Sequence, residues 1–268
     1  MQLDIQGTQA YCYTGGKAFD PALPTVVFIH GAQNDHSVWA LQSRYLAHHG
    51  YSVLAPDLPG HGRSEGAALR SVEEMAAWLI AVLEAAGVGQ AGAALVGHSM
   101  GSLIALEAAS QAPARVARLA LLGATYPMKV SDALLGAALE NEASAIDMVN
   151  IWSHSTIAAK PSSPGPGFYI TGVSKRLMER MSALNPDKLL HTDFTACNSY
   201  ANGDTAAASI RCPVQFIFGS KDMMTPPRST KALLAALPQA RTVTVDAGHQ
   251  MMAEQPDAVL DALSAFLR

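Results

Sequence analysis

Short apolar runs alternate along this chain with stretches whose apolar residues recur at helical spacing. Continuous apolar runs bounded by turn residues are typical of strands that are buried on both faces. Strands are predicted at 25–30, 52–55, 92–97, 116–122, 214–218 and 242–246. Helices are predicted at 71–86, 100–111, 227–236 and 256–267. This alternation predicts an α/β fold, with a mostly parallel sheet and helices on both faces.

Two regions depart from the alternation. Segments 2–7 and 9–14 predict an antiparallel hairpin at one edge of the sheet. Residues 126–200 form a mixed helical stretch, and such a length is too great for an ordinary loop. We therefore expect a core of residues 1–125 and 201–268 and a helical cap of residues 126–200, with a hinge or exposed loop at 161–167. The cap would lie beyond the carboxyl ends of the strands, where open parallel sheets bind ligands.

One motif stands at the junction of a predicted strand and a predicted helix. Gly97-His98-Ser99-Met100-Gly101 fits the pattern G-x-S-x-G, which in this context predicts a sharp turn that exposes a nucleophilic serine. The flanking glycines allow the backbones to approach, and the amide of Met100 begins a helix and can stabilise an oxyanion. The alternative is a glycine-rich turn in which the serine has no role.

A serine nucleophile needs a base, and the base needs an acid. His249 follows the last predicted strand, and Asp222 follows strand 214–218, so both belong at the carboxyl end of the sheet with Ser99. The order Ser99, Asp222, His249 is the one found for this kind of turn. Asp246 is a weaker candidate for the acid, because it is close to His249 in sequence. Ala32, in the loop after strand 25–30, is the candidate second oxyanion donor.

The other histidines have less specific settings. His30 and His61 lie in glycine-rich turns, where we expect them to make hydrogen bonds that shape the turns. His48 and His49 end a predicted amphipathic helix, so we expect their side chains to be solvated. The side chain of His98 is expected to point away from the serine. Three further histidines could line a pocket: His36, His154 and His191.

Composition excludes several classes of protein. The 268 residues are 49% hydrophobic and 15% charged, which is not the composition of a disordered chain. The net charge of −4 argues against a nucleic-acid partner. Cys12, Cys197 and Cys212 are too far apart for a metal site or a disulfide framework. We expect no metal and no organic cofactor. The N-terminus lacks a signal pattern and no apolar run reaches membrane length, so a cytoplasmic protein is expected, either a monomer or a homodimer.

Several motifs in order resemble the α/β-hydrolase superfamily over nearly the whole chain. They are His30-Gly31, Trp39, the loop from Pro56 to Ser64, the elbow 97–101, Gly219 to Asp222, and Gly248-His249. The resemblance implies an α/β-hydrolase fold: an eight-stranded, mostly parallel sheet with a helical cap inserted after the sixth strand. It also implies that Asp57 and His61 shape a loop. Ser99 differs from the aspartate nucleophile of haloalkane dehalogenases and epoxide hydrolases, which excludes their alkyl-enzyme route. Ser102 disfavours many carbon–carbon bond hydrolases, and Ala32 departs from perhydrolase-type members.

These residues predict a serine hydrolase that cleaves small to medium carboxylic esters through an acyl-enzyme on Ser99. A lactone, thioester or carbon–carbon bond hydrolase, a lyase with the same triad, and a ligand receptor of the same fold stay open as alternatives. The small-molecule pocket is expected to take its lining from aromatic and methionine side chains of the cap, although most of these could equally pack in a helical core. They are Met128, Met148, Trp152, Phe168, Tyr169, Met178 and Met181.

Overall fold

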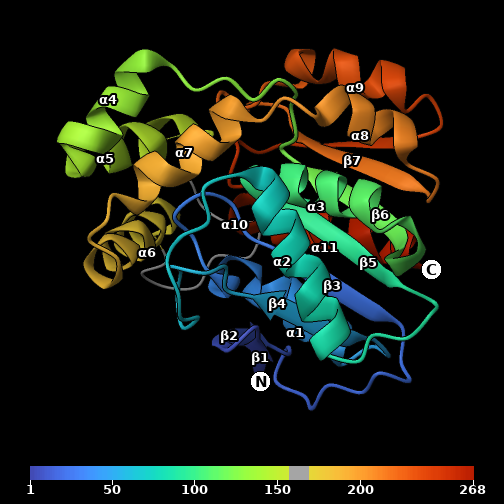
Figure 1. Cartoon of the computed structure of the whole chain (residues 1–268). Coiled ribbons are helices and arrows are strands. Elements are labelled where there is room, and N and C mark those ends of the chain that lie inside the picture. The colour runs from blue at the N-terminus through green and yellow to red at the C-terminus, as the bar shows by residue number, and fades with distance from the viewer. Residues whose placement is uncertain (157–168) are drawn as a thin grey trace.

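A single eight-stranded sheet forms the centre of the protein (Figure 1). The computed structural model describes residues 1–156 and 169–268. The spatial order of the strands is β1-β2-β4-β3-β5-β6-β7-β8. Their bounds are β1 Gln2–Ile5, β2 Thr8–Tyr13, β3 Thr25–Ile29, β4 Ser52–Pro56, β5 Ala93–His98, β6 Val116–Leu122, β7 Val214–Gly219 and β8 Arg241–Val245.

The pairing of the strands confirms the predicted mostly parallel sheet and its edge hairpin. Strands β3 to β8 pair in parallel, whereas β2 is antiparallel to both β1 and β4. The strand order reverses between β3 and β5, since β4 lies on one side of β3 and β5 to β8 on the other. Ligands of open α/β sheets bind at such a reversal, beyond the carboxyl ends of the strands.

Helices cover both faces of the sheet. Their bounds are α1 Ala40–Ala47, α2 Val72–Ala85, α3 Met100–Gln111, α4 Asp132–Glu140, α5 Glu142–Ser153, α6 Ile170–Leu184, α7 Leu189–Ser199, α8 Gly203–Ser209, α9 Lys231–Ala236, α10 Met251–Glu254 and α11 Pro256–Leu267. Figure 1 shows α2 and α3 in front of the central strands, with α1 and α11 behind them. The predicted helices 100–111 and 256–267 have these bounds in the structure, and the helix predicted at 227–236 begins as a 3-10 turn before α9.

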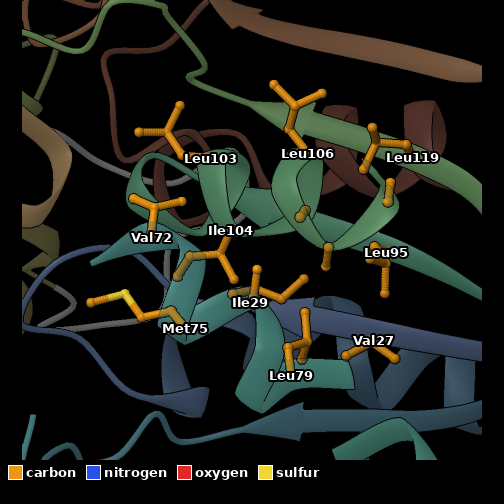
Figure 2. Close-up of a cluster of buried hydrophobic side chains, with 14 of the residues drawn as sticks. Val27, Ile29, Val72, Met75, Leu79, Leu95, Leu103, Ile104, Leu106 and Leu119 are labelled. Carbon is orange, nitrogen blue, oxygen red and sulfur yellow. The ribbon is translucent and has the colours of Figure 1, made fainter. Parts of the chain in front are cut away.

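Alternate residues of each central strand belong to opposite halves of the core, because successive side chains of a strand point to opposite faces. Val27 and Ile29 pack with α2 and α3, whereas Val26 and Phe28 pack with α1 and α11. Figure 2 shows the first cluster, in which Met75 and Leu79 of α2 and Ile104 of α3 lie close to Val27 and Ile29 of the sheet. A rigid sheet held in this way gives the strand ends fixed positions.

The first turn of α2 shows how local sequence sets an element's start. The Ser71 side chain accepts a hydrogen bond from the amide of Glu74, as the S-x-x-E pattern predicts. The Glu74 carboxylate accepts from the amide of Arg70 instead of that of Ser71. The reciprocal hydrogen bond of a capping box, which would join the carboxylate to the Ser71 amide, is therefore shifted by one residue.

Helices α4 to α7 lie between β6 and β7 in the chain, where the cap is predicted, and they gather together on one side of the sheet in Figure 1. They contact the loops that follow β3 and β4, through side-chain hydrogen bonds to Gln33 and Gly60. Helix α8 packs on α3 and α9 instead. The division at residues 126 and 200 stays a prediction, and the hinge predicted at 161–167 lies outside the described residues.

Among the helices of the described ranges, none combines the length and the hydropathy that a membrane-spanning segment requires.

Candidate active site

Ser99 occupies the single residue between β5 and α3 and has a strained backbone. Its φ of 55° and ψ of −121° lie in a region that residues other than glycine rarely adopt. Gly97 and Gly101 make this turn possible. A Cβ on Gly97 would lie 2.1 Å from the carbonyl oxygen of Gly101, and a Cβ on Gly101 would lie 2.3 Å from that of Ile29. The turn is packed so closely that neither position can carry a side chain.

Asp222 and His249 form a buried pair at the carboxyl ends of β7 and β8. Nδ1 of His249 donates to Oδ2 of Asp222 over 2.8 Å. Oδ1 of Asp222 accepts from the amides of Met224 and Thr225, at 2.9 and 2.8 Å. The hydroxyl of Thr225 donates to Oδ2 over 2.8 Å and lies 3.1 Å from Nδ1 of His249. The carboxylate therefore has fixed partners on both oxygens, and the imidazole has a fixed orientation.

The pKa of Asp222 reflects two opposing effects. Burial by itself raises the pKa of a carboxyl group, because it disfavours the charged form. The charge and hydrogen bond of His249, together with the hydrogen bonds from Thr225, outweigh burial and lower the pKa of Asp222 to about 2. The group is therefore a carboxylate at neutral pH, which can stabilise an imidazolium.

Asp246, the weaker candidate for the acid, lies elsewhere. Its side chain is 73% exposed, and it pairs with Lys221 and accepts from Ser220. These partners lower its pKa. It has the surroundings of a surface ion pair, and no hydrogen bond or ion pair joins it to His249 in the described part of the chain.

His98 braces the loop that carries His249, a role that its sequence position did not indicate. Its Nε2 lies 2.9 Å from the backbone oxygen of His249, and the two rings are 4.6 Å apart between centroids. Burial, with the nearby charge of His249, lowers the pKa of His98 to about 3, so this ring is neutral and its Nε2–H donates. Because His98 directly precedes Ser99, this bond joins the serine turn to the histidine loop.

Gly123, at the end of β6, leaves the space that the His249 ring fills. A Cβ at this position would lie 2.9 Å from Cε1 and 3.1 Å from Nδ1 of His249, and the φ of Gly123 is +55°. The position therefore requires glycine for its conformation and for the histidine beside it.

Ser99 opens onto a cavity of about 200 Å³ under the inserted helices. Ala32 and Thr225 line the same cavity, so it lies between the loop after β3 and the Asp222–His249 pair. The remaining described lining residues are mostly apolar: Met128, Lys129, Val130, Ser131, Leu134, Trp152, Phe194, Cys197, Met223 and Met224. Ser99 Oγ has no hydrogen bond within the described residues, and such contacts often tighten only when substrate is bound.

The predicted lining was partly wrong. Met128 and Trp152 line the cavity, as predicted. Met178 is instead buried among the inserted helices and Met181 against the loop after β4, and Tyr169 is 51% exposed. Met148 packs on the apolar cluster of the inserted helices, and Phe168 lies outside the described residues. The three histidines that could line a pocket are absent from the described lining of this cavity.

Two backbone amides near Ser99 donate no hydrogen bond within the described residues. The amides of Ala32 and Met100 have no hydrogen-bond acceptor among residues 1–156 and 169–268. Gly31 packs against the serine, since a Cβ there would lie 3.2 Å from Cβ of Ser99. The first N–H groups of a helix have no acceptor within the helix, which explains the free amide of Met100. Both amides are candidates for binding a developing oxyanion.

Polar groups around the loop after β4 shape that loop. Oδ1 of Asp57 accepts from the amide and Nδ1 of His36, and Oδ2 accepts from the amide of Arg63. His30 Nε2 accepts from the amide of Leu58. Asp35, His36 and Asp57 could bring three ligand atoms within 4.8 Å of one another. Asp35 pairs with Arg180, and the Asp57 oxygens are engaged as described, so this cluster has the contacts of a structural network.

Cys12, Cys197 and Cys212 are free thiols. Cys197 lines the cavity, but burial and the charge of Asp193 raise its pKa. It is therefore a protonated thiol and a poor nucleophile.

Known proteins share this architecture and sequence pattern. The family model of the α/β-hydrolase fold matches residues 24–256. An (E)-2-((N-methylformamido)methylene)succinate hydrolase from Acinetobacter baylyi is 25% identical over 248 residues, which cover 90% of this chain and 89% of that protein. A thermophilic esterase has a TM-score of 0.80 at 22% identity, covering 100% of this chain and 96% of that one. The enol-lactonase from Burkholderia xenovorans has a TM-score of 0.75 at 22% identity, covering 100% and 99%.

The two structural likenesses establish the fold, and the family model extends over most of the sequence, from β3 to the start of α11. On this evidence the chain belongs to the α/β-hydrolase family.

Proposed function

We propose that this hydrolase cleaves small to medium carboxylic esters through an acyl-enzyme on Ser99. One observation carries the proposal. Ser99 is held in a strained turn that opens onto a cavity, and the same cavity is lined by Thr225, which bonds the buried Asp222–His249 pair. Such strain persists only where the surrounding structure enforces it, and it is common at catalytic residues.

In the first half of the proposed reaction, His249 takes the proton of Ser99 as Oγ attacks the ester carbonyl carbon. The new C–O bond places a negative charge on the carbonyl oxygen, which accepts hydrogen bonds from the amides of Ala32 and Met100. Asp222 stabilises the imidazolium that forms. His249 then gives its proton to the departing alcohol as the ester C–O bond breaks, which leaves an acyl group on Ser99.

The second half regenerates the serine. His249 takes a proton from water as the water oxygen attacks the acyl carbon, and the same two amides hold the second oxyanion. Collapse of this intermediate breaks the bond to Oγ of Ser99, and His249 returns the proton to that oxygen. The products are a carboxylic acid, an alcohol and the free enzyme.

The size of the cavity favours short acyl groups. Its volume of about 200 Å³ is below the roughly 300–1,000 Å³ that is usual for ligand pockets. Leu134, Trp152 and Phe194 supply apolar walls. We therefore expect acetyl to butyryl esters to be cleaved better than long-chain esters. A lactone or thioester of similar size would follow the same first step.

The test is hydrolysis of p-nitrophenyl esters from acetate to laurate, with mass spectrometry of the protein after reaction with a fluorophosphonate. Wild type should turn over the short esters and gain one phosphonyl adduct on Ser99. Ser99→Ala should lose both. Ser220→Ala is the matched control, because Ser220 is an exposed serine near the end of β7, and it should behave as wild type.

Each outcome has a distinct meaning. Turnover that survives in Ser99→Ala would overturn the proposed nucleophile. An adduct on Ser99 without turnover of any ester would retain the nucleophile but reject the ester substrates, and lactones, thioesters and carbon–carbon bond substrates would then be assayed. Absence of both turnover and adduct would favour a ligand receptor.

A further inference from the structure

A buried ion pair joins the inserted helices to the core on the side of the Ala32 loop. Nε2 of His61, in the loop after β4, lies 2.9 Å from Oδ2 of Asp193 in α7. Both side chains are almost fully buried, at 1% and 0% exposure. A buried carboxylate is costly unless it is paired and hydrogen-bonded, so the partners of this one matter to the fold.

The second partner of Asp193 is the backbone next to the candidate oxyanion donor. Oδ2 of Asp193 also accepts from the amide of Gln33, at 2.8 Å. Gln33 has a φ of 51°, a left-handed conformation that a residue with a side chain adopts at some cost. The hydrogen bond that the Gln33 amide donates to Asp193 offsets this cost at the residue that directly follows Ala32.

Hydrogen bonds therefore fix both of the peptide units that flank Ala32. The carbonyl oxygen of Gly31 accepts from the amide of Asn34 over 3.3 Å, and the peptide that carries this oxygen also carries the amide of Ala32. The next peptide unit ends at the amide of Gln33, which Asp193 holds. Because each peptide unit is planar, fixing these two groups sets the direction of the Ala32 N–H.

We propose that Asp193 of the inserted helix α7 is a positioning residue for the oxyanion-binding amide of Ala32. The inference rests on the proposed function, and it makes catalysis depend on how α7 docks on the loop after β3. Asp193 is not a catalytic residue, since it acts through the backbone of Gln33.

His61 keeps the Asp193 carboxylate in place. Burial by itself lowers the pKa of His61, but the charge and hydrogen bond of Asp193 outweigh it and raise that pKa above its ordinary value. The carboxylate thus lies between the His61 ring on one side and the Gln33 amide on the other. A neutral side chain in place of His61 would remove the charge that pairs with Asp193.

Other contacts to Gln33 offer a matched control. The side-chain amide of Gln33 donates to Oε1 of Glu142 over 2.8 Å and to Oγ of Ser182 over 2.7 Å. Glu142 is also an acidic residue of the inserted helices, but it contacts the side chain of Gln33 and not its backbone. Glu142→Gln therefore changes a carboxylate to an amide at the same residue without freeing the Ala32 loop.

The experiment compares Asp193→Ala, Asp193→Asn and Glu142→Gln with wild type. Steady-state kinetics use the best p-nitrophenyl ester, and inhibition is measured with a trifluoromethyl ketone, which forms an oxyanion on the serine. We expect Asp193→Ala to lower kcat roughly 10- to 100-fold with little change in KM, less than the roughly 100- to 1,000-fold cost of losing a donor outright. Inhibition by the ketone should weaken by a similar factor.

The conservative variant separates positioning from general support of the fold. Asp193→Asn keeps an oxygen that can accept from the Gln33 amide, so it should recover part of the lost kcat. Glu142→Gln should stay within about twofold of wild type. If Asp193→Ala does not fold, Asp193→Asn decides the question. If Asp193→Ala folds, a kcat and ketone affinity of that variant equal to those of Glu142→Gln would overturn the proposal. If it does not fold, the same equality in Asp193→Asn would overturn it.

A readout without turnover distinguishes this proposal from the proposed function. Hydrogen–deuterium exchange of the peptide that contains residues 31–35 should be faster in Asp193→Ala than in Glu142→Gln. Active wild type with unchanged exchange and kcat in Asp193→Ala would reject only the positioning role. A wild type that cleaves no ester, with faster exchange in Asp193→Ala, would reject the ester hydrolase and leave the link between Asp193 and the loop in place.

Discussion

The hydroxyl of Thr225 donates a 2.8 Å hydrogen bond to Oδ2 of Asp222, the same oxygen that accepts from His249. A hydrogen bond to a charged group contributes about 1.5–3 kcal/mol, so its loss should be measurable. Thr225→Val keeps the shape of the side chain and removes the donor. We expect kcat/KM to fall roughly tenfold, since 1.4 kcal/mol corresponds to one factor of ten.

Thr225→Ser is the matched variant for this prediction. It retains the hydroxyl and should recover most of the lost kcat/KM. Equal rates for wild type and Thr225→Val, measured across the pH range in which both are folded, would show that the hydroxyl is dispensable.

The two aspartates near His249 should differ sharply in their effect on catalysis. Asp222→Asn removes the charge that favours the correct tautomer of His249, and such a change lowers kcat by about 10⁴-fold in a comparable triad. Asp246→Asn should leave kcat within about twofold, because Asp246 is exposed and pairs with Lys221. Measurement of kcat for both variants checks the assignment, and a large loss in Asp246→Asn would reverse it.

Gly123→Ala should impair catalysis more than it impairs folding. The added methyl group would approach Cε1 of His249 to 2.9 Å, so the ring must move away from its place beside Asp222. We expect a loss of kcat of at least about tenfold, because general-base catalysis requires the His249 ring to lie within hydrogen-bond reach of the proton it takes. Gly136→Ala in α4 is the control, because a Cβ there meets nothing within 4 Å and should stabilise the helix by about 0.5–1 kcal/mol. Thermal unfolding and kcat are measured together, and normal activity of Gly123→Ala would contradict the prediction.

Trp152 should limit the length of the acyl group. It lines the cavity from the end of α5, and replacing it with alanine enlarges a space of about 200 Å³. We expect Trp152→Ala to shift the best p-nitrophenyl ester toward longer chains, as measured by kcat/KM from acetate to laurate. Met148→Ala removes a side chain of the same helix that packs on the helical cluster, and it should not change the preference. An unchanged chain-length profile in Trp152→Ala would place the acyl group elsewhere.

The His61–Asp193 pair should make stability depend on pH. Because the pKa of His61 is raised in the folded state, protonated His61 contributes stability that is complete below about pH 6.5. That contribution is lost as the pH rises through the folded-state value. The loss of melting temperature in His61→Gln should therefore be larger at pH 6 than at pH 9.

The same comparison in an Asp193→Asn background isolates the pair. Without the carboxylate, the larger cost of His61→Gln at pH 6 should disappear or reverse, because the coupling is absent and burial by itself lowers the pKa of His61. A pH trend that persists in this background would assign the effect to another partner of His61.

Elements with strong local signals could be predicted closely from the sequence. Helix α11 begins at Pro256, whose ring suits the first turn of a helix, and α3 begins directly after the Gly-x-Ser-x-Gly turn. The first strand of the edge hairpin was predicted too long, at 2–7, and the second was predicted one residue late, at 9–14. Gln6 and Gly7 both adopt positive φ values, 55° and 83°, so they form the turn and not the strand.

Contacts between distant segments could not be predicted in this way. Thr225 and His98 each support His249, yet nothing in their sequence neighbourhoods indicates the partner. Met178 and Met181 were expected at the pocket because of their chemical type. The packing of α6 turns them inward, and a methionine's side-chain type does not reveal which face of its helix is buried.

The sequence by itself determined the alternation of strands and helices, the position of Ser99 at a strand-to-helix turn, and the strand ends that carry Asp222 and His249. These features depend on periodicity, glycine spacing and turn residues, which act over a few positions. Only the tertiary structure decided which hydroxyl bonds Asp222, which side chains line the cavity, and that Asp193 of α7 reaches Gln33. Those contacts join residues that are as many as 160 positions apart. They arise from the docking of whole elements, whose relative placement depends on packing throughout the core.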